Sequence, residues 1–494
     1  MSIDTTTVQE PAQEAILAAA QANLLIGGDW VPASGNKTYT VYDPSTEEPL
    51  IEVADAAPAD GRRALEAAVA AQPGFAARTP KFRAGILREV VRILQERMET
   101  MARLLSMEAG KPLFESRAEI NSGIDFIEHF AEEAVRTAGN YQVNPVSGGR
   151  MIVVKQPIGT SILITPWNFP FSQAARKLAP AIAAGCTIVI KPATETPLVL
   201  LAFVQAFIDA GVPAGVLNTV TTSSPNAVME PLIRSGLARK LSFTGSTPVG
   251  VKLLEQAAEQ VLSTSLELGG NAPFIVFDDA DLQVAIDALM MNKMWNAGQT
   301  CTSANRIFVH ANVIDRFQEM LVERMCGYVQ GNWAEDGVNL GPLINARQVG
   351  HVTAIVDDAV AKGAKLVLGG GCPDRAGYFY RPTVLRDVPA DALLNTEEIF
   401  GPIAPLISFD DEQDVVRRAN DTDYGLVAYV FTQNLDRAVR VSEALETGNV
   451  GLNRGTVAYS AAPFGGVKKS GLGREGSAEG LDEFLETKFI ALQL

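Results

Sequence analysis

The chain is poor in cysteine and histidine, and the few that it has are widely spaced. It contains four cysteines and three histidines in 494 residues. No two of the cysteines Cys186, Cys301, Cys326 and Cys372 form a C-x-x-C pair, and no histidine has a second histidine four positions away. These spacings argue against a zinc ribbon, a zinc hydrolase, a dithiol redox motif and a disulfide framework. We therefore expect no metal site and a reducing compartment.

Long apolar runs, a leader and an excess of basic residues are also missing. The longest apolar run, 178–190, is interrupted by Gly185 and is too short to cross a bilayer. The first residues show no basic region followed by an apolar one, so no secretory signal is expected. With 57 acidic against 41 basic residues the formal net charge is −16, which disfavours nucleic acid and anionic membranes as partners. We expect a cytoplasmic protein with a small-molecule substrate.

The sequence lacks the G-x-S-x-G motif of α/β-hydrolases as well. With 47% hydrophobic and 20% charged residues, the composition is that of a globular protein rather than a disordered one. The length exceeds what one ordinary core holds, so two or three domains are expected.

In the middle of the chain, short apolar strands alternate with helices. Strands are expected at 160–164, 187–190, 216–220 and 240–243, and helices at 171–184, 198–210, 225–235 and 247–260. This alternation predicts a doubly wound parallel sheet whose strands end at one edge, where ligands bind in such folds. A second α/β unit is expected to follow, with strands at 274–277, 307–309, 366–368, 403–407 and 426–430 and helices at 281–295 and 313–327.

The segments outside these two units are expected to add helices and a few strands. Helical segments are expected near 15–22, 58–75, 81–108 and 114–136, and strands at 24–31 around a glycine turn, 38–42, 151–157 and 489–494. The segment 81–108 has one continuous apolar stripe at helical spacing, which indicates a packing face. The strand at 489–494 has no later strand to pair with, so we expect it to pair with another subunit.

The stretch 296–306 carries the candidate nucleophile, Cys301. Gly298 permits backbone angles that other residues resist, so a sharp loop is expected just before the cysteine. Such a loop would present the sulfur at a cleft, where a thiolate is a strong nucleophile. The alternative on this stretch alone is a buried, inert cysteine that packs as a small apolar residue.

Further polar motifs lie close to the expected strands. Asn168 lies between two prolines after the first strand of the parallel sheet, and Lys191 follows the second strand. The run 243–247 opens a helix with a glycine and hydroxyls, which is typical of a phosphate site. Glu267 precedes two glycines. Taken singly, these residues are equally a turn former, a solvated strand end, a helix cap and a surface charge.

Together these motifs resemble the NAD(P)-dependent aldehyde dehydrogenase superfamily over roughly residues 20–490. The matching runs, in the order of that family, are 165–170, 243–247, 267–270, 298–301, 397–402 and 463–466. The resemblance implies an α/β protein with two doubly wound parallel-sheet domains and a small β oligomerisation arm. It implies a Rossmann-like cofactor-binding domain at 20–140 and 158–265, a catalytic domain at 266–455 and an arm at 141–157 and 478–494.

The resemblance also implies a reaction and its catalytic residues. Cys301 would attack an aldehyde carbon, and the Asn168 amide with the Cys301 backbone N–H would form an oxyanion hole. After hydride transfer to a nicotinamide, Glu267 would activate the water that hydrolyses the thioester. Family members that pass the acyl group to coenzyme A generally lack this glutamate, so its presence implies a free acid as product.

The cofactor implied by the resemblance is NADP or NAD. Glu398 resembles the residue that holds the nicotinamide ribose, and Phe400 the one beside the ring. The other residues that resemble cofactor contacts are Thr165, Pro166, Trp167, Lys191, Thr194, Gly245, Ser246 and Leu268. Family members strict for NAD tend to carry a glutamate where this chain has Thr194, so we expect NADP to be accepted.

The substrate is less sharply indicated than the reaction. The overall wording is most similar to succinate-semialdehyde dehydrogenases, in which an arginine matching Arg176 binds the distal carboxylate. A second carboxylate-binding arginine of that subfamily is Trp295 here, its usual second cysteine is Ser303, and Tyr459 stands where a small polar residue is usual. Trp167, Trp295 and Tyr459 would alternatively line a funnel for an apolar or aromatic aldehyde, and Trp295 is equally a residue of plain helix packing.

Two other expectations follow from the resemblance. Family members pair through their arms, so a homodimer or homotetramer is expected. Because fold alone does not give function, a non-catalytic cofactor-binding protein remains the alternative from another class.

Overall fold

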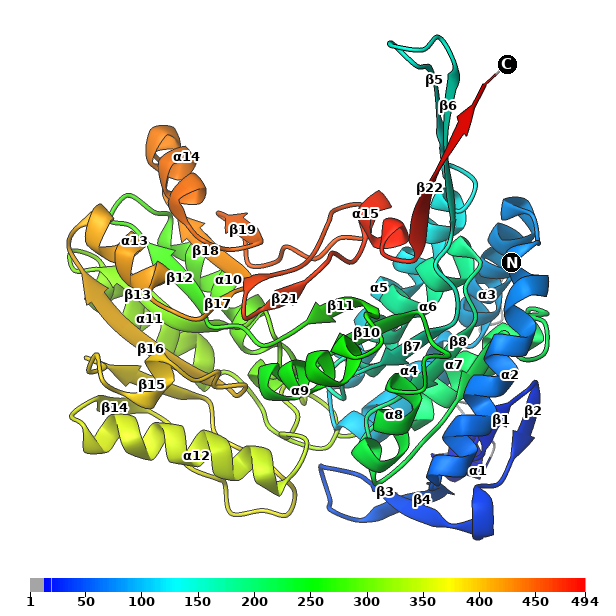
Figure 1. The fold of residues 1–494 in the computed structure, drawn as a ribbon. Helices are drawn as coiled ribbons and strands as arrows, with labels where there is room; N and C mark the ends of the chain where they lie inside the picture. Colours follow the sequence, from blue (N-terminus) through cyan, green and yellow to red (C-terminus); the bar gives the residue numbers. More distant parts are fainter. Residues whose placement is uncertain (1–12, 19, 494) are drawn as a thin grey trace, which may run out of the picture.

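Two sheets, each built mainly of parallel strands, form the two halves of the molecule (Figure 1). They are seen in a computed structural model that describes residues 13–18 and 20–493. The predicted α/β class with two doubly wound sheets is confirmed.

The first sheet has the strand order β2-β1-β9-β8-β7-β10-β11-β21. Its parallel strands are β7 (Ser161–Ile164), β8 (Ile188–Lys191), β9 (Leu217–Thr219), β10 (Lys240–Thr244) and β11 (Ser263–Glu267), and its antiparallel edge strands are β1 (Leu24–Ile26), β2 (Asp29–Val31) and β21 (Gly471–Leu472). The connecting helices are α6 (Pro170–Ala184), α7 (Leu198–Asp209), α8 (Pro225–Ile233) and α9 (Thr247–Ala258). The strand order reverses between β7 and β10, which is where open α/β sheets bind ligands.

The second sheet has the order β14-β15-β16-β13-β12-β18-β19. Its strands are β12 (Ala272–Val276), β13 (Ala304–His310), β14 (Lys365–Leu368), β15 (Thr383–Arg386), β16 (Ile403–Phe409), β18 (Val427–Phe431) and β19 (Asn449–Leu452), all parallel to their neighbours except β14. Its helices are α10 (Leu282–Lys293), α11 (Ile314–Cys326), α12 (Ala346–Ala361), α13 (Glu412–Asn420) and α14 (Leu435–Ala444). Cys301 and Glu398 lie in loops that lead into β13 and β16, at the amino ends of these strands.

The remaining elements surround the first sheet or join the two halves. They are α1 (Gln13–Ala18), β3 (Thr38–Tyr42), β4 (Pro49–Ala54), α2 (Pro58–Ala76), α3 (Pro80–Glu96), α4 (Met98–Ala109), α5 (Leu113–Glu133), β17 (Tyr424–Gly425), β20 (Val467–Lys468) and α15 (Ser477–Asp482), with short 3-10 turns at Ser34–Asn36, Trp295–Gly298 and Leu393–Asn395. The helical lead-in predicted at 15–22 is the short α1, and residue 19 lies outside the described residues.

Near the first sheet, one predicted helix is wrong and one strand was not predicted. The single helical segment expected at 81–108 is two helices, α3 and α4, which meet at Arg97. The apolar stripe runs through this junction, so periodicity could not reveal the break; Arg97 turns out of the helix and pairs with Asp209 at 2.6 Å. Strand β11 was missed because it begins with Ser263, Thr264 and Ser265, which give no apolar run. It pairs with β10 and ends at Glu267.

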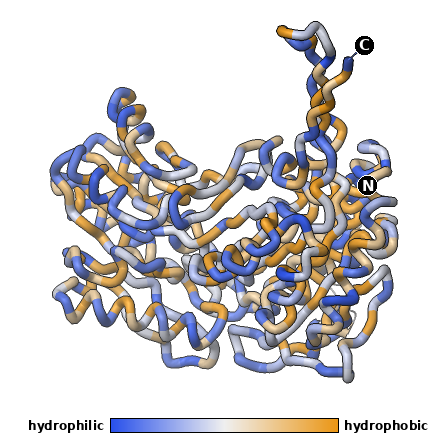
Figure 2. Tube along the Cα trace, viewed as in Figure 1, coloured by the Kyte–Doolittle hydropathy of each residue, from blue (hydrophilic) through white to orange (hydrophobic). Residues whose placement is uncertain are grey.

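The last strand pairs within its own chain, so pairing with another subunit stays a prediction, and residue 494 of the expected strand lies outside the described residues. Strand β22 (Leu485–Leu492) pairs antiparallel with β6 (Arg150–Pro157) of the same chain, and β5 (Asn140–Val143) pairs with the other side of β6. The three strands form an arm that projects from the body (Figure 1). Along the arm, apolar and polar residues are interspersed (Figure 2), and Tyr141 and Phe489 are 61% and 58% exposed.

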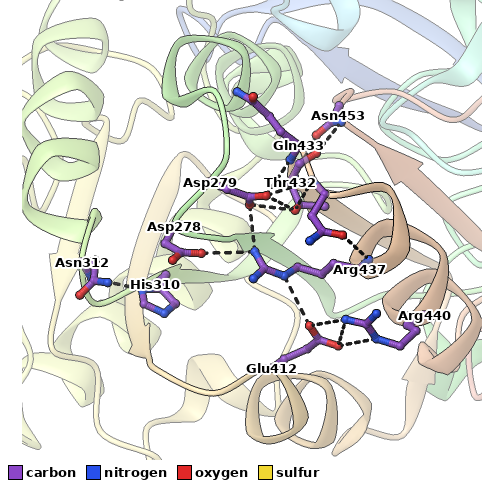
Figure 3. Close-up of polar contacts among 11 residues, drawn as sticks. Asp278, Asp279, His310, Asn312, Glu412, Thr432, Gln433, Arg437, Arg440 and Asn453 are labelled. Carbon is purple, nitrogen blue, oxygen red and sulfur yellow. Dashed lines mark hydrogen bonds and ion pairs between the residues drawn. The ribbon is translucent and has the colours of Figure 1, made fainter.

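At the carboxyl edge of the second sheet, a charged network holds α13 and α14 (Figure 3). Arg437 of α14 lies 3.2 Å from Asp278, 2.9 Å from Asp279 and 3.4 Å from Glu412. Its guanidinium stacks on the ring of Phe277 at 4.5 Å. These charges satisfy one another, so we assign this cluster a structural role at the edge of the sheet.

Candidate active site

The turn that carries Cys301 has an unusual backbone. Asn296, Ala297 and Gly298 have φ values of 50°, 53° and 75°, so three successive residues adopt the left-handed conformation. A Cβ atom on Gly298 would lie 2.2 Å from the carbonyl oxygen of Gly401. Only glycine fits this position, and the sharp loop predicted before the cysteine is confirmed.

Side chains from both halves hold the backbone on either side of Cys301. The carbonyl of Gln299 accepts a hydrogen bond from Asn168 Nδ2 at 3.0 Å. The carbonyl of Thr302 accepts from Asn292 Nδ2 at 3.0 Å and from the Tyr429 hydroxyl at 2.9 Å. The turn is therefore fixed on both sides of the cysteine, and Cys301 itself is partly exposed.

The surroundings of Cys301 favour the protonated thiol. Burial raises its pKa to about 12, the negative charge of Glu398 adds to the increase, and Arg176 opposes it. Glu267 and Glu475 raise the pKa further. At neutral pH the thiol must therefore lose its proton to a nearby group before it acts as a nucleophile.

Glu267 ends β11 as a buried carboxyl group with an open oxygen. It is 5% exposed, and within the described part of the chain its Oε2 has no hydrogen-bond partner. Burial raises its pKa well above the ordinary value, the charge of Glu475 raises it further, and Lys177 and Arg176 oppose the increase. A carboxylate with a raised pKa is a stronger base than an ordinary glutamate.

The guanidinium of Arg176 lies near Glu475 and makes few polar contacts. Its guanidinium stacks on the rings of Phe126, at 4.6 Å, and Phe464, at 5.1 Å. It is 8% exposed, and its ion pair with Glu475 is long at 3.8 Å, whereas Lys177 binds the other oxygen of that carboxylate at 2.7 Å. Among the described residues, nothing accepts a hydrogen bond from its Nε.

Two of the predicted cofactor residues meet across the two halves. The rings of Trp167 and Phe400 contact edge to face, with centroids 5.4 Å apart. Phe400 has a left-handed φ of 54°. Glu398 accepts a hydrogen bond from the Gly270 N–H at 3.2 Å, and burial raises its pKa to about 8.

Other predicted cofactor residues lie at the carboxyl edge of the first sheet. Lys191 is buried, its Nζ donates to the carbonyl of Pro192 at 2.6 Å, and burial lowers its pKa to about 8. The hydroxyl of Thr194 donates to the carbonyl of Thr222 at 3.1 Å. The buried hydroxyl of Thr165 has no partner in the described part of the chain, and the adjacent Pro166 is half-buried.

The amino end of α9 completes this edge. Gly245 N–H donates to the carbonyl of Glu267 at 3.0 Å, and a Cβ on Gly245 would lie 2.4 Å from the ring of Phe243. Ser246, the residue before the helix, is exposed and makes no side-chain cap. Leu268 packs under the first turn. A buried lysine, an open hydroxyl and an uncapped helix end together suit a phosphate-bearing cofactor.

Trp295 and Tyr459 are predicted to line a substrate funnel, and the ring of each contacts one other side chain. Trp295 contacts Phe114 of α5 edge to face at 5.9 Å. Tyr459 is 41% exposed, and the guanidinium of Arg454 stacks on its ring at 4.9 Å. Neither aromatic side chain is part of the sealed core.

Sequence reasoning missed the buried charges beneath the site. Lys111 donates to Glu119 at 2.6 Å and to the carbonyl of Asn168 at 2.8 Å. The carboxyl group of Glu115 accepts the Asn296 N–H at 3.0 Å and so braces the left-handed turn. The sequence signal that could have revealed them is the position of these charged residues on otherwise buried faces. A buried charge is costly unless it is paired, so such a position indicates a buried partner.

Replacing Lys111 with methionine should destabilise the protein strongly. Lys111 and Glu119 are each 1% exposed, and removing one partner leaves the other charge buried, at a cost of about 3–5 kcal/mol. We expect a lower midpoint in urea unfolding followed by tryptophan fluorescence. The control is Arg62→Met, which breaks an exposed pair with Glu66 and should cost about 0.5 kcal/mol or less. Equal midpoint shifts in the two variants would contradict the prediction.

Known proteins share this sequence and fold over nearly their full length. The aldehyde dehydrogenase family model matches residues 30–490. The chain is 47% identical over 470 residues to the NADP(+) succinate-semialdehyde dehydrogenase GabD of Escherichia coli, covering 95% of this chain and 97% of that protein. It is 46% identical over 469 residues to glutarate-semialdehyde dehydrogenase of Pseudomonas putida, covering 95% and 97%. A crystal structure of an NADP-dependent enzyme from E. coli has a TM-score of 0.95 at 47% identity, covering 96% of this chain and 98% of that one.

The fold and these relatives define an oxidoreductase. The chain belongs to the aldehyde dehydrogenase family, and the resemblance drawn from its six sequence runs is confirmed. The alternative of a non-catalytic cofactor-binding protein is not supported. Across residues 13–18 and 20–493, no group of three His, Cys, Asp or Glu side chains is arranged to hold a metal ion, and no helix is both long and apolar enough to span a membrane.

Proposed function

We propose that the protein oxidises aldehydes with an anionic far end, succinate semialdehyde above all, to the free acid with NADP or NAD. The observation that carries the anionic substrate is Arg176, a buried guanidinium whose Nε has no hydrogen-bond partner among the described residues and whose charge acts on Cys301. A buried arginine with unused donors is built to receive a carboxylate. Names of relatives at 46–47% identity, which act on succinate and glutarate semialdehydes, support the same class.

The chemistry begins with the Cys301 thiol. Its proton passes to a nearby base, for which Glu267 has the raised pKa and the open oxygen. The sulfur then attacks the aldehyde carbon and forms a thiohemiacetal. Asn168 Nδ2 uses one N–H on Gln299, which leaves its second N–H to stabilise the oxyanion together with the Cys301 backbone N–H.

Oxidation and hydrolysis complete the turnover. A bound NADP or NAD would supply the hydride acceptor for the thiohemiacetal, which would leave a thioester on Cys301. Glu267 would release the proton taken from Cys301 to solvent and would then remove a proton from the water that attacks the thioester. The carboxylic acid would leave, and the Cys301 thiolate would take up a proton to restore the thiol. Trp167 and Phe400 would hold the nicotinamide from the two halves, and Glu398 would bind its ribose.

The choice between NADP and NAD depends on the end of β8. The neighbouring carboxylate, Glu195, accepts a hydrogen bond from Asn345 at 3.3 Å, so Thr194 and Lys191 remain to meet the adenosine ribose. We expect Thr194→Glu to lower kcat/KM for NADP by about 10- to 100-fold, because a carboxylate repels a 2′-phosphate. Thr194→Gln, which adds the length without the charge, is the control. A wild-type kcat/KM that strongly favours NAD would contradict this assignment.

The function is tested by steady-state kinetics of the wild-type protein on succinic semialdehyde, hexanal and benzaldehyde with both cofactors. We expect kcat/KM to be highest for succinic semialdehyde. The second candidate, oxidation of apolar or aromatic aldehydes, is favoured by the exposed ring of Tyr459 and by the contact between Trp295 and Phe114. A higher kcat/KM for hexanal or benzaldehyde would establish that candidate instead.

The assembly, the compartment and the domain roles belong to the same proposal. The residues 20–140 and 158–265 bind the cofactor and 266–455 carry the catalytic cysteine. The arm of β5, β6 and β22 joins copies of the chain into a dimer or tetramer, supported by the exposed side chains of Tyr141 and Phe489. We assign the protein to the cytoplasm because its four widely spaced cysteines suit a reducing compartment.

A further inference from the structure

An aldehyde with an anionic far end needs a cation that is free to bind it. Among the cations around the catalytic turn, Lys177 is bound to Glu475 at 2.7 Å and Lys293 is fully buried against the hydroxyl of Ser303 at 3.2 Å. Arg474 donates to the backbone carbonyls of Gly466 and Gly473. These contacts leave Arg176, which is buried, and one exposed arginine.

The exposed arginine is Arg454, in the loop after β19. A single side chain connects this loop to the nucleophile turn: Asn292 Nδ2 donates to the carbonyl of Thr302 at 3.0 Å and to that of Gly455 at 3.3 Å. The residues that follow Cys301 and Arg454 therefore share one donor. The carbonyl of Gly455, the residue directly after Arg454, therefore lies close to the catalytic turn.

The side chain of Arg454 is oriented but not neutralised. Its guanidinium stacks on the ring of Tyr459 at 4.9 Å. Within the described part of the chain it makes no ion pair with a carboxylate. Stacking covers one face of a guanidinium and leaves the N–H groups at its edge available for a bidentate carboxylate.

We propose that Arg454, held on Tyr459, is a specificity-determining residue that binds the distal anion of the substrate at the entrance of the site. This inference rests on the proposed function and names a residue that carries part of its selectivity. The stacking ring gives Tyr459 a positioning role: it keeps a flexible, exposed arginine in one place. Arg176 then meets the same substrate from the buried side.

The test is a kinetic comparison of wild type, Arg454→Gln, Arg454→Lys and Tyr459→Leu on succinic semialdehyde and hexanal. For Arg454→Gln we expect KM for succinic semialdehyde to rise about tenfold with kcat nearly unchanged, because one charge-assisted contact is lost. Arg454→Lys keeps the charge but loses the bidentate guanidinium, so we expect a smaller rise in KM. The KM of Tyr459→Leu should lie between those of Arg454→Lys and Arg454→Gln. KM for hexanal should stay the same in Arg454→Gln.

Salt and a distant arginine serve as controls. KM for succinic semialdehyde should increase with ionic strength in the wild type and much less in Arg454→Gln, because exposed charges are screened. Arg88→Gln, at an exposed arginine of α3, should match the wild type in every assay. If the wild type prefers succinic semialdehyde but Arg454→Gln leaves the KM for that substrate unchanged, the inference is overturned. If the wild type shows no such preference, the proposed function fails first.

Discussion

Cys301→Ala should lower kcat for aldehyde oxidation by about 10⁴-fold or more, since the covalent route is lost with the nucleophile. The other cysteines offer no substitute: Cys186 is sealed in the core, and Cys326 and Cys372 are exposed outside the turn. Only Cys301 lies in the turn held by Asn168. The measurement is cofactor reduction at saturating aldehyde.

The matched control is Cys326→Ala, which removes an exposed cysteine and should leave kcat unchanged. Quenching of tryptophan fluorescence by NADPH should remain in Cys301→Ala, which shows that the cofactor site is intact. Persistent oxidation in Cys301→Ala would refute the nucleophile assignment. Alkylation of the free protein by iodoacetamide offers an independent check: because the thiol pKa is raised to about 12, the rate should be slow at neutral pH and increase as the pH rises.

Glu267→Gln should separate oxidation from hydrolysis. The amide cannot take a proton from water, so the thioester accumulates and steady-state kcat falls by about 10²- to 10⁴-fold. A stopped-flow trace should still show a burst of reduced cofactor before turnover stalls. Because deprotonation of Cys301 also uses this carboxylate, we expect the burst to be slower than in the wild type.

The pH dependence gives the same assignment a second test. Glu267 acts as a base only when it is deprotonated, and its pKa is raised by burial and by Glu475. The wild-type kcat should therefore fall as the pH drops through that raised pKa and level off above it. This limb should be absent in Glu267→Gln. Glu486→Gln, at an exposed position of β22, is the control, and a wild-type profile in Glu267→Gln would contradict the role of this carboxyl group.

Some strands and turns of this protein could be predicted from their own residues. The first three residues of β8 are apolar and the strand ends at Lys191, and α4 stops at Gly110, whose φ is 71°. Strand β11 gave no such signal, because its first three residues are polar. It forms because β10 lies beside it with open backbone groups, and pairing of that kind is not encoded in a strand's own composition.

Some features of the candidate site could likewise be predicted from the sequence, and others could not. Gly298 and Asn168 were predictable from turn chemistry and from the order of the motifs. The bonds from Lys111 to Asn168 and from Glu115 to Asn296 were not, because they join residues 57 and 181 positions apart. Hydrophobic periodicity finds the faces that pack and says nothing about which buried charge meets which backbone group.

The amino-acid sequence by itself determined the family and the α/β class and predicted Cys301, Glu267 and Asn168 as the reactive set, because these depend on motifs and on local strand and helix patterns. The tertiary structure alone decided that Arg176 is buried with an unused donor and that Arg454 stacks on Tyr459 next to the catalytic turn. The surroundings of Arg176 are supplied by α5 and by the segment 464–475, and the stacking of Arg454 depends on the path of the loop after β19. No local sequence pattern specifies these distances.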